Sequence, residues 1–353
     1  MIYFIIKRIL SGILILFSVT TVVFFLFKFS FPNPEKMAVG QRTDKLTQES
    51  IKKEFGLDKS SFVQYLLFLN DISPLSFHKE KNKTQLIEKY EPITQIKILN
   101  HTILLKRPFL RKSFQSRIRT GQLIKDSFKG TLVLTLVSIL FATFFGVLLG
   151  IISSLKVNSL LDQFIVFIST LGISVPSFFS AIILSWLFGF LLHDYTGLSM
   201  SGSWIDLDPY TGIYYQWKNL LLPAIALGVR PLSIFTLLTR SSMLDTLNKD
   251  FIKTARSKGL NSFKILSIHA LPNALNPVVT AISGWFASLL AGAFFVEYIF
   301  NWHGLGKLTI DALEMNDLPV VMGAILFIAL IFIIMNIVVD IIYTKLDPRI
   351  QLN

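Results

Sequence analysis

The stretch KTARSKGLNSFKILSIHALPNAL, residues 253–275, is a basic and polar segment between two long apolar runs. Gly259 stands where a left-handed cap would end one helix, and Asn261 or Ser262 can begin a second helix. The side chains expected to share an inward face are Phe251, Ile252 and Ala255 in the first helix and Phe263, Leu266 and Ala270 in the second. Pro272 is expected to end the second helix or re-aim it toward the next apolar run. The spacing therefore predicts a short, stiff helical connection.

The apolar runs around this segment are those of a membrane protein. The chain has 353 residues, of which 52% are hydrophobic and 16% charged, and its mean hydropathy is +0.59. A bilayer core about 30 Å thick is crossed by roughly 20 apolar residues in a helix. Six runs qualify, at residues 9–31, 132–155, 164–192, 220–238, 278–300 and 320–343. We expect an all-α integral membrane fold with six transmembrane helices.

Charge distribution predicts the orientation of these spans. The run after Lys7 and Arg8 is longer than the apolar core of a signal peptide, so we interpret it as an uncleaved first span. Lys and Arg in short loops mark the cytoplasmic side, which places the N-terminus, the 253–275 loop and the C-terminal tail inside the cell. Much of the net charge of +12 lies in residues 32–129, which argues against a nucleic-acid partner. The chain has no cysteine and its histidines are scattered, so no metal site is predicted.

The expected organisation follows from these spans. Residues 1–31 form the tail and first span, residues 32–128 an extracytoplasmic segment, residues 129–345 a core with five spans and a cytoplasmic loop at 241–275, and residues 346–353 a cytoplasmic tail. In the extracytoplasmic segment we expect two amphipathic helices broken at Gly56, the second capped by Asp58 or Ser60. A β-like stretch, IKILNHTILL, follows with Asn100 in a turn.

Two local signals modify the spans. Pro176 is expected to bend or break the third span. Gly146 and Gly150 form a small-xxx-small pattern, which permits close approach of helices but is also common in spans by chance.

The 253–275 loop has two interpretations from physics alone. It is either an interfacial helix resting on lipid headgroups or a docking helix that transmits the movement of a partner. Its residues resemble the cytoplasmic coupling motif of ATP-binding-cassette importer permeases, which is written EAA, three residues, Gly, nine residues, I-x-L-P. Ala255, Gly259, Leu271 and Pro272 match this motif, whereas Lys253, Thr254 and His269 replace its Glu, first Ala and Ile.

Those departures match the form found in B-type subunits of dipeptide, oligopeptide and nickel permeases. The resemblance continues in LTRSSMLDTLNKDFIKTARSKGL, VEYIFNWHGLGKLTIDAL, the terminal DPRI, the first span and EFGLD, while residues 76–107 resemble an insertion. It implies that the residues contacting the ATPase are Lys253, Thr254, Ala255, Lys258, Gly259, Leu260, His269, Ala270, Leu271 and Pro272.

The resemblance also implies the partners. They are a second, homologous permease, two cytoplasmic ATPases that use ATP and Mg, and an extracytoplasmic substrate-binding protein, in a bacterial cytoplasmic (inner) membrane. The expected cargo is a peptide, with nickel or another small solute as the alternative. An ion-coupled secondary transporter would need buried pairs of acidic residues and preferably inverted repeats, and the sequence shows neither. Clustered carboxylates or histidines that would suggest a membrane enzyme are not visible either.

Two motifs in the apolar part concern binding. GLGKLT, residues 304–309, resembles the end of a phosphate-binding loop but lacks its first glycine and its Ser or Thr after Lys307, so we expect no nucleotide site. Arg230 lies ten residues into the fourth span, near the bilayer midplane, where a charge needs a partner or water. It faces either the translocation path or the partner permease, or it pairs with Glu297 or Asp340. Glu297 is otherwise expected to be a solvated residue at the rim of the fifth span.

Overall fold

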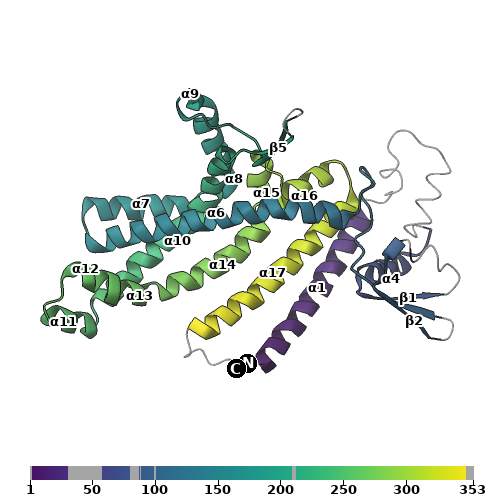
Figure 1. Ribbon diagram of the computed structural model, residues 1–353, viewed down its shortest axis with the longest axis horizontal. Helices are drawn as coiled ribbons and strands as arrows, with labels where there is room; N and C mark the ends of the chain where they lie inside the picture. Colours follow the sequence, from purple (N-terminus) through teal and green to yellow (C-terminus); the bar gives the residue numbers. More distant parts are fainter. Residues whose placement is uncertain are drawn as a thin grey trace. The chain divides into compact units, whose positions relative to one another are not determined.

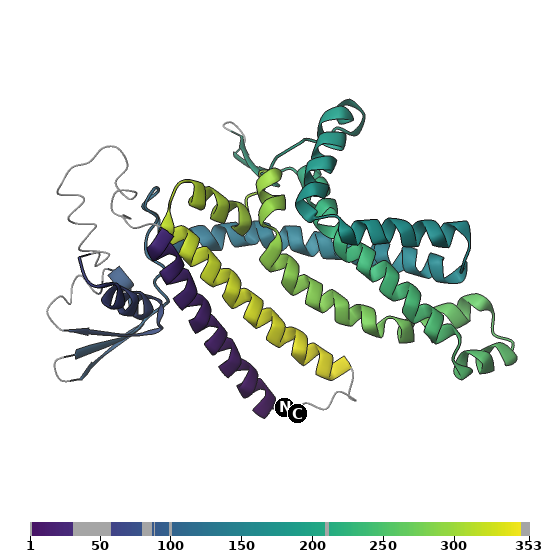
Figure 2. The same cartoon turned by 180° about the vertical axis from the view of Figure 1, so that it is seen from behind.

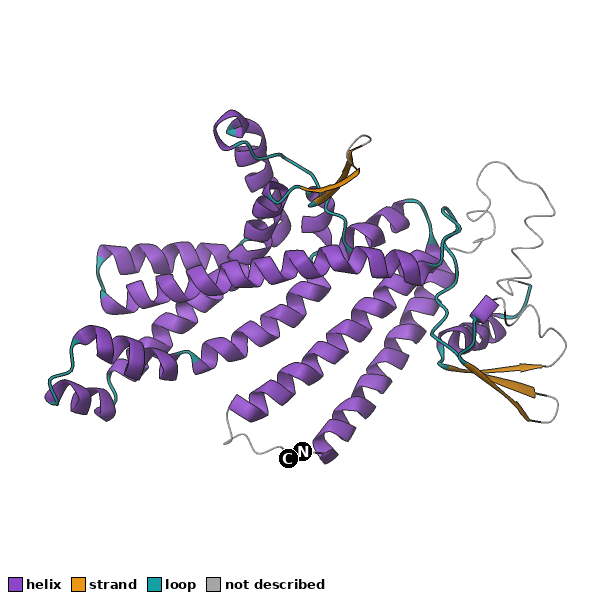
Figure 3. Ribbon diagram, in the orientation of Figure 1, coloured by secondary structure: helices purple, strands orange, loops and turns teal. Residues whose placement is uncertain are grey.

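The structure is a computed structural model that describes residues 2–30, 58–79, 87, 89–98, 101–208 and 212–346. Helices make up most of the described chain, as Figure 3 shows in purple. The chain divides into two compact units, each treated by itself below. Unit 1 contains residues 1–14, 127–307 and 328–353, and unit 2 contains residues 15–126 and 308–327.

Four helices are long and apolar enough to cross a membrane: α1 (Ile2–Ser30), α6 (Thr120–Leu155), α10 (Lys218–Leu247) and α17 (Leu318–Leu346). Two bent helix pairs also qualify, at Leu160–Ser174 with Ser177–Leu191 and at Ser262–Ala274 with Asn276–Gly292. The described residues thus contain between four and six candidate spans, the higher number holding if each bent pair is one span. Each predicted apolar run overlaps one of these helices or pairs, but the fifth run, 278–300, extends past Gly292 onto a separate short helix.

The third predicted run is broken at Pro176. It consists of α7 (Leu160–Ser174), α8 (Ser177–Leu184) and a π-helix, η2 (Ser185–Leu191). α7 and the α8–η2 segment meet at an angle of 108°. Val175, immediately before the proline, has an extended backbone, because the proline ring disfavours the helical conformation of the residue before it. The predicted break is confirmed, and the run is not one straight helix.

Helix α10 is the centre of unit 1. It packs against α7, α8 and α14 (Asn276–Gly292), and it continues through Pro223 and Pro231. A Cβ atom built on Gly146 would lie 2.8 Å from the Leu232 carbonyl oxygen, and one on Gly150 would lie 2.7 Å from the Thr236 carbonyl oxygen. Both distances are shorter than real Cβ contacts. The small-xxx-small pattern is therefore a true contact between α6 and α10.

Short elements complete unit 1. They are α9 (His193–Thr196), β4 (Ile205–Asp208), β5 (Gly212–Tyr215), α11 (Asp250–Ser257), α12 (Ser262–Lys264), the π-helix η3 (Ile265–Ala270), α13 (Leu271–Ala274) and α15 (Phe294–Ile299). Helix α16 (Leu305–Glu314) begins in unit 1 and ends in unit 2. Figures 1 and 2 both show α11 to α13 at the C-terminal end of α10.

Unit 2 combines helix ends with a small sheet. Helix α4 (Ser61–Ile72) precedes β1 (Leu75–Lys79), β2 (Thr94–Ile98) and β3 (His101–Leu105), which form an antiparallel sheet in the order β1-β3-β2. The predicted strand pair is confirmed by β2 and β3, with Ile98 opposite His101. Ser60 stands at the start of α4, but its side chain makes no capping hydrogen bond, so that prediction is wrong. Gly56, Asn100 and the DPRI motif lie outside the described residues.

A buried carboxylate organises the polar interior of unit 2. Asp71 accepts a hydrogen bond from the Tyr90 hydroxyl at 2.7 Å and from Arg111 Nε at 3.1 Å. Its backbone carbonyl accepts from Lys106 Nζ, and the Lys106 side chain is itself buried. Since buried charges are tolerated only when they are paired and hydrogen-bonded, this network joins α4 to the strands' flanking segments.

Candidate coupling site

The first helix of the 253–275 region is α11, and it ends at the glycine that the sequence singled out. Gly259 has φ +75°, in the left-handed region, and its N–H donates to the Arg256 carbonyl at 2.9 Å. A residue without Cβ adopts this conformation at no steric cost. Asn261 then caps the second helix, because its Oδ1 accepts from the Lys264 N–H at 2.8 Å. Both predicted caps are confirmed.

The predicted inward faces are only partly right. Ile252 and Ala255 are buried as expected, but Phe251 is 41% exposed. In the second helix, Ala270 is buried whereas Phe263 is 76% exposed. Pro272 does not end this helix, which continues to the end of α13 at Ala274.

A π-helix explains the error in the second helix. An α-helical period places Phe263, Leu266 and Ala270 on one face, but residues 265–270 form the π-helix η3. Its i to i+5 spacing brings Ile265 and Ala270 onto the same side. Ile265 is therefore the residue that is buried, at 5% exposure, and Phe263 is turned outward.

The inward residues join the loop to the preceding span. A cluster that we call the loop core contains Met243 from α10 together with Ile252, Ala255, Ile265, Ala270 and Ala274. Met243, Ile252, Ala270 and Ala274 have no exposed surface. Close packing of this kind resists relative motion, so α11 to α13 form a rigid extension of α10 that leads into α14.

Some of the predicted coupling residues are buried within α11 to α13, and others are exposed on their surface. Ala255 and Ala270 are buried in the loop core, and Leu260, His269 and Leu271 are half-buried. Those that are exposed are Lys253, Thr254, Lys258, Gly259 and Pro272. The outer surface also carries two apolar side chains, Phe263 and the 61% exposed Ile268. The loop thus presents apolar and cationic groups together on a rigid support.

A bidentate ion pair braces the helices beside the loop. Asp162 in the first turn of α7 accepts from Arg240 Nε and Nη2 of α10, both at 2.7 Å. The carboxylate is 3% exposed, and it also accepts from the Ser153 hydroxyl and from the Asn158 N–H at 2.9 Å. Sequence analysis did not predict this pair, because the two residues are 78 positions apart. Asp162 stands three residues after Ser159, which caps α7, and this spacing was the available signal.

Arg230 has neither of the carboxylate partners considered from the sequence. Its guanidinium lies 5.8 Å from the centre of the Trp285 ring, and its side chain is exposed. Asp340 instead lies 3.1 Å from Arg8 Nε. The Arg230 side chain is therefore accessible from the surface beside α10 and α14.

Glu297 is fully buried, so its expected place at a solvated rim is wrong. Its carboxylate accepts from the Thr131 hydroxyl at 2.6 Å and from the N–H groups of Gly306 at 2.6 Å and Lys307 at 3.2 Å. The GLGKLT stretch that resembles a phosphate-binding loop thus surrounds a carboxylate of the same chain. This is the ordinary affinity of a helix N-terminus for an anion, satisfied internally.

The sequence matches two protein-family models and several named relatives. Residues 146–352 match the family model of the binding-protein-dependent transport system inner membrane component, and residues 1–85 match the model of its N-terminal region. A di/tripeptide transport system permease protein of Pseudomonas aeruginosa is 33% identical over 99% of both chains. An oligopeptide transport system permease protein of Bacillus subtilis is 30% identical, and a glutathione transport system permease protein of Escherichia coli is 32% identical, each over 99% of both chains.

The chain belongs to the family of binding-protein-dependent transport system inner membrane components. It is a multi-pass permease subunit of an ATP-binding-cassette importer, and its role is transport. An importer of this type generally comprises a second permease, ATPase subunits and a substrate-binding protein.

Proposed function

We propose that this permease imports peptides and that its 253–275 loop is the lever on which a cytoplasmic ATPase acts. The observation that carries the proposal is the loop core, in which Ile252, Ile265 and Ala270 lock α11 to α13 onto Met243 of α10. A displacement applied to the exposed surface of such a body moves α10 and α14 with it. A flexible loop would absorb the same displacement.

The exposed side chains fit a protein surface better than a lipid surface alone. Phe263 and Ile268 project from the second helix of the loop, while Lys253 of α11 and Lys258, at the end of α11, are also exposed. Lys253 is held by Asp250 at 2.9 Å, so part of the cationic surface is oriented in advance. Aromatic and cationic side chains on a rigid base are the usual anchors of protein interfaces. The coupling residues proposed here are those of the motif, from Lys253 to Pro272.

The proposed arrangement in the membrane has six spans with both termini in the cytoplasm and residues 32–128 outside. This arrangement places the loop on the side where ATP is available. It also places the extracytoplasmic segment on the side of a substrate-binding protein. The partner permease can be a homologue or a second copy of this chain, and two ATPase subunits complete the complex.

The lever is tested by substituting Gly259 with valine. A left-handed backbone costs a residue with Cβ about 1 to 2 kcal/mol, so Gly259→Val is expected to distort the turn between α11 and α12. We expect normal membrane insertion but loss of copurified ATPase or of transport-linked ATP hydrolysis. Gly121→Val is the matched control, because a Cβ at Gly121 would meet no atom within 4 Å. Wild-type coupling in Gly259→Val would refute the lever.

The cargo proposal rests on the relatives. Permeases named for di/tripeptides, oligopeptides and glutathione match this chain over nearly its full length, and all three cargoes are peptides. Uptake of a labelled dipeptide by cells carrying the complete transporter, compared with cells lacking this chain, tests the proposal. Uptake of nickel or another small solute in place of peptides would refute it.

A further inference from the structure

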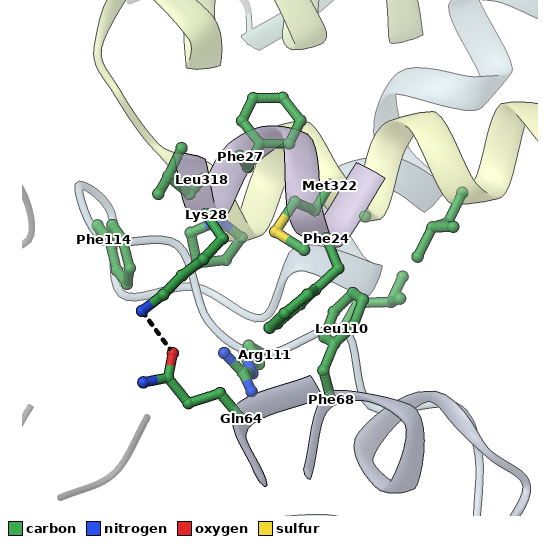
Figure 4. A pocket seen from close by; sticks show the side chains of 13 residues that line it. Phe24, Phe27, Lys28, Gln64, Phe68, Leu110, Arg111, Phe114, Leu318 and Met322 are labelled. Atoms are coloured by element: carbon green, nitrogen blue, oxygen red, sulfur yellow. Dashed lines mark hydrogen bonds between the residues drawn. The ribbon is translucent and has the colours of Figure 1, made fainter. Parts of the chain in front are cut away.

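Unit 2 contains a pocket with one polar end and one apolar end (Figure 4). Thirteen residues of α1, α4, the segment before α6 and the start of α17 enclose about 740 Å³ of space that is open to solvent. Figure 4 shows Lys28, Gln64 and Arg111 at one end, with Phe24 and Met322 farther from the Lys28 ammonium. Phe68 lies between the two ends, because the Arg111 guanidinium is 5.6 Å from the centre of its ring.

Contacts between α1 and α4 place the pocket beside the end of the first span. The Thr21 and Tyr65 hydroxyls are 2.6 Å apart, and the rings of Phe24 and Phe68 are 5.5 Å apart. Thr21 lies nine residues before Ser30, where α1 ends, which is about 14 Å at 1.5 Å per residue. Helix α4 therefore lies along the last turns of α1, which is a candidate membrane span.

Within the described residues, the polar end carries one positive charge that has no acidic partner. Arg111 lies 3.1 Å from the Asp71 carboxylate, which neutralises it. Lys28 Nζ donates to the neutral Gln64 Oε1 at 2.9 Å, and no acidic side chain of the described chain pairs with it. None of the thirteen lining residues, all within the described ranges, is acidic. A half-buried ammonium in such a place favours an anion.

In the part of the chain that the structure describes, the surroundings of the pocket carry exposed apolar side chains. Phe62 and Leu66 on the outward side of α4 are 65% and 47% exposed. Leu26 and Phe29 on α1 are 53% and 80% exposed. Side chains of this kind on a transmembrane helix are covered by lipid, and α4 extends the same apolar surface sideways. In the membrane arrangement proposed above, the pocket opens beside the outer end of the first span.

We propose that this pocket binds one anionic phospholipid. Its phosphate pairs with the Lys28 ammonium, and the part of an acyl chain nearest the headgroup packs against Phe24, Phe27 and Phe68. The proposal rests on the membrane arrangement given above, but not on the cargo or on the coupling loop. Arg111 supplies a second donor at the same end. An anionic headgroup is preferred to a zwitterionic one because no lining carboxylate is present to receive an amine.

The test measures lipid that stays with the purified transporter complex. The complex is reconstituted in nanodiscs with equal amounts of phosphatidylglycerol and phosphatidylethanolamine, released into detergent, and examined by native mass spectrometry. We expect wild type to retain one phosphatidylglycerol and Lys28→Met to retain at least about tenfold less, the factor that a hydrogen bond to a charged group typically contributes. Lys28→Arg should restore retention. Lys125→Met removes an exposed cation outside the pocket and should leave the retention of phosphatidylglycerol unchanged.

A second variant tests the apolar end. Met322→Trp fills the space beside Phe24 while leaving Lys28 in place, and it should also reduce retention. Equal retention of the two lipids, or wild-type retention in both Lys28→Met and Met322→Trp, would overturn the proposal. Displacement of the lipid by millimolar inorganic phosphate would overturn it as well, because it would assign the site to a free anion. Retention is read without transport, so the outcome is independent of the proposed function.

Discussion

The carboxylate of Glu297 lies 2.6 Å from the backbone nitrogen of Gly306, at the N-terminal end of α16. The Thr131 hydroxyl donates to the same carboxylate and in turn accepts from the Leu305 N–H at 2.8 Å. One buried acidic side chain therefore connects α15, α6 and α16. Buried charges persist only with several such donors, which makes this a sensitive point of the fold.

The glycines around Glu297 are expected to tolerate no side chain. A Cβ on Gly304 would overlap all three carboxylate atoms of Glu297, and one on Gly306 would lie 2.9 Å from its Oε2. Gly304→Ala should lower the free energy of unfolding by about 1 to 3 kcal/mol, the typical cost of overpacking. Thermal denaturation of the purified protein measures it. Gly121→Ala is the control. Equal melting temperatures of the two variants would contradict the prediction, because they would show that the residues around Glu297 accommodate the extra methyl group without cost.

Removing only one member of the Asp162–Arg240 pair should lower the free energy of unfolding by more than half of what removing both members costs. The reason is that a single substitution leaves the other charge buried without its partner. Asp162→Ala leaves Arg240 without its partner in a site where the guanidinium is 23% exposed. Loss of one member of a buried pair typically costs about 3 to 5 kcal/mol, and this partial exposure favours the lower end. The double variant with Arg240→Ala should cost less than the sum of the single variants. A double-mutant cycle by denaturation checks this, and strict additivity would contradict it.

Stability of unit 2 should rise with pH because of Lys106. Burial lowers the pKa of Lys106 from 10.5 to about 8, the nearby Asp71 opposing this shift. Between these two pKa values the unfolded chain binds more protons than the folded one, so the free energy of unfolding increases with pH. The penalty of the buried charge is present below pH 8 and is relieved as pH approaches 10.5.

The comparison is between wild type and Lys106→Met from pH 7.5 to 9.5. Wild type should gain about 2 kcal/mol relative to the variant over this interval. The window avoids Tyr90, whose pKa is raised by burial and by Asp71, because its effect on stability begins near pH 10. A difference between the two proteins that does not change with pH would contradict the prediction.

Arg230 should be needed for transport but not for folding. Its guanidinium contacts only the Trp285 ring among the described residues, so Arg230→Met should alter the unfolding temperature little. If Arg230 faces the translocation path or the partner permease, uptake in an assembled Arg230→Met transporter should fall severalfold. Arg230→Lys keeps the charge and should retain part of the uptake. Undiminished uptake in Arg230→Met would remove this residue from the pathway.

Local signals in the sequence were sufficient for the spans and for the turns of the coupling loop. The apolar runs predicted where the four to six candidate spans of the described residues occur, and Pro176 marked a real break. Gly259 and Asn261 were identified correctly, because a left-handed cap and a side-chain cap depend on one residue and its immediate neighbours. The faces of the loop helices were harder, since the π-helix at residues 265–270 changes the period on which such a prediction relies.

The sequence by itself determined that this is a multi-span membrane protein with a capped helical loop of the importer permease type. Only the tertiary structure decided which charges are buried and with whom. Thr131 and Glu297 are 166 positions apart, and Asp162 and Arg240 are 78 positions apart. Apolar periodicity and capping act over a few residues, whereas the partner of a charge depends on how distant helices pack. Burial of Glu297 and the brace on α10 could therefore be seen only in the folded chain.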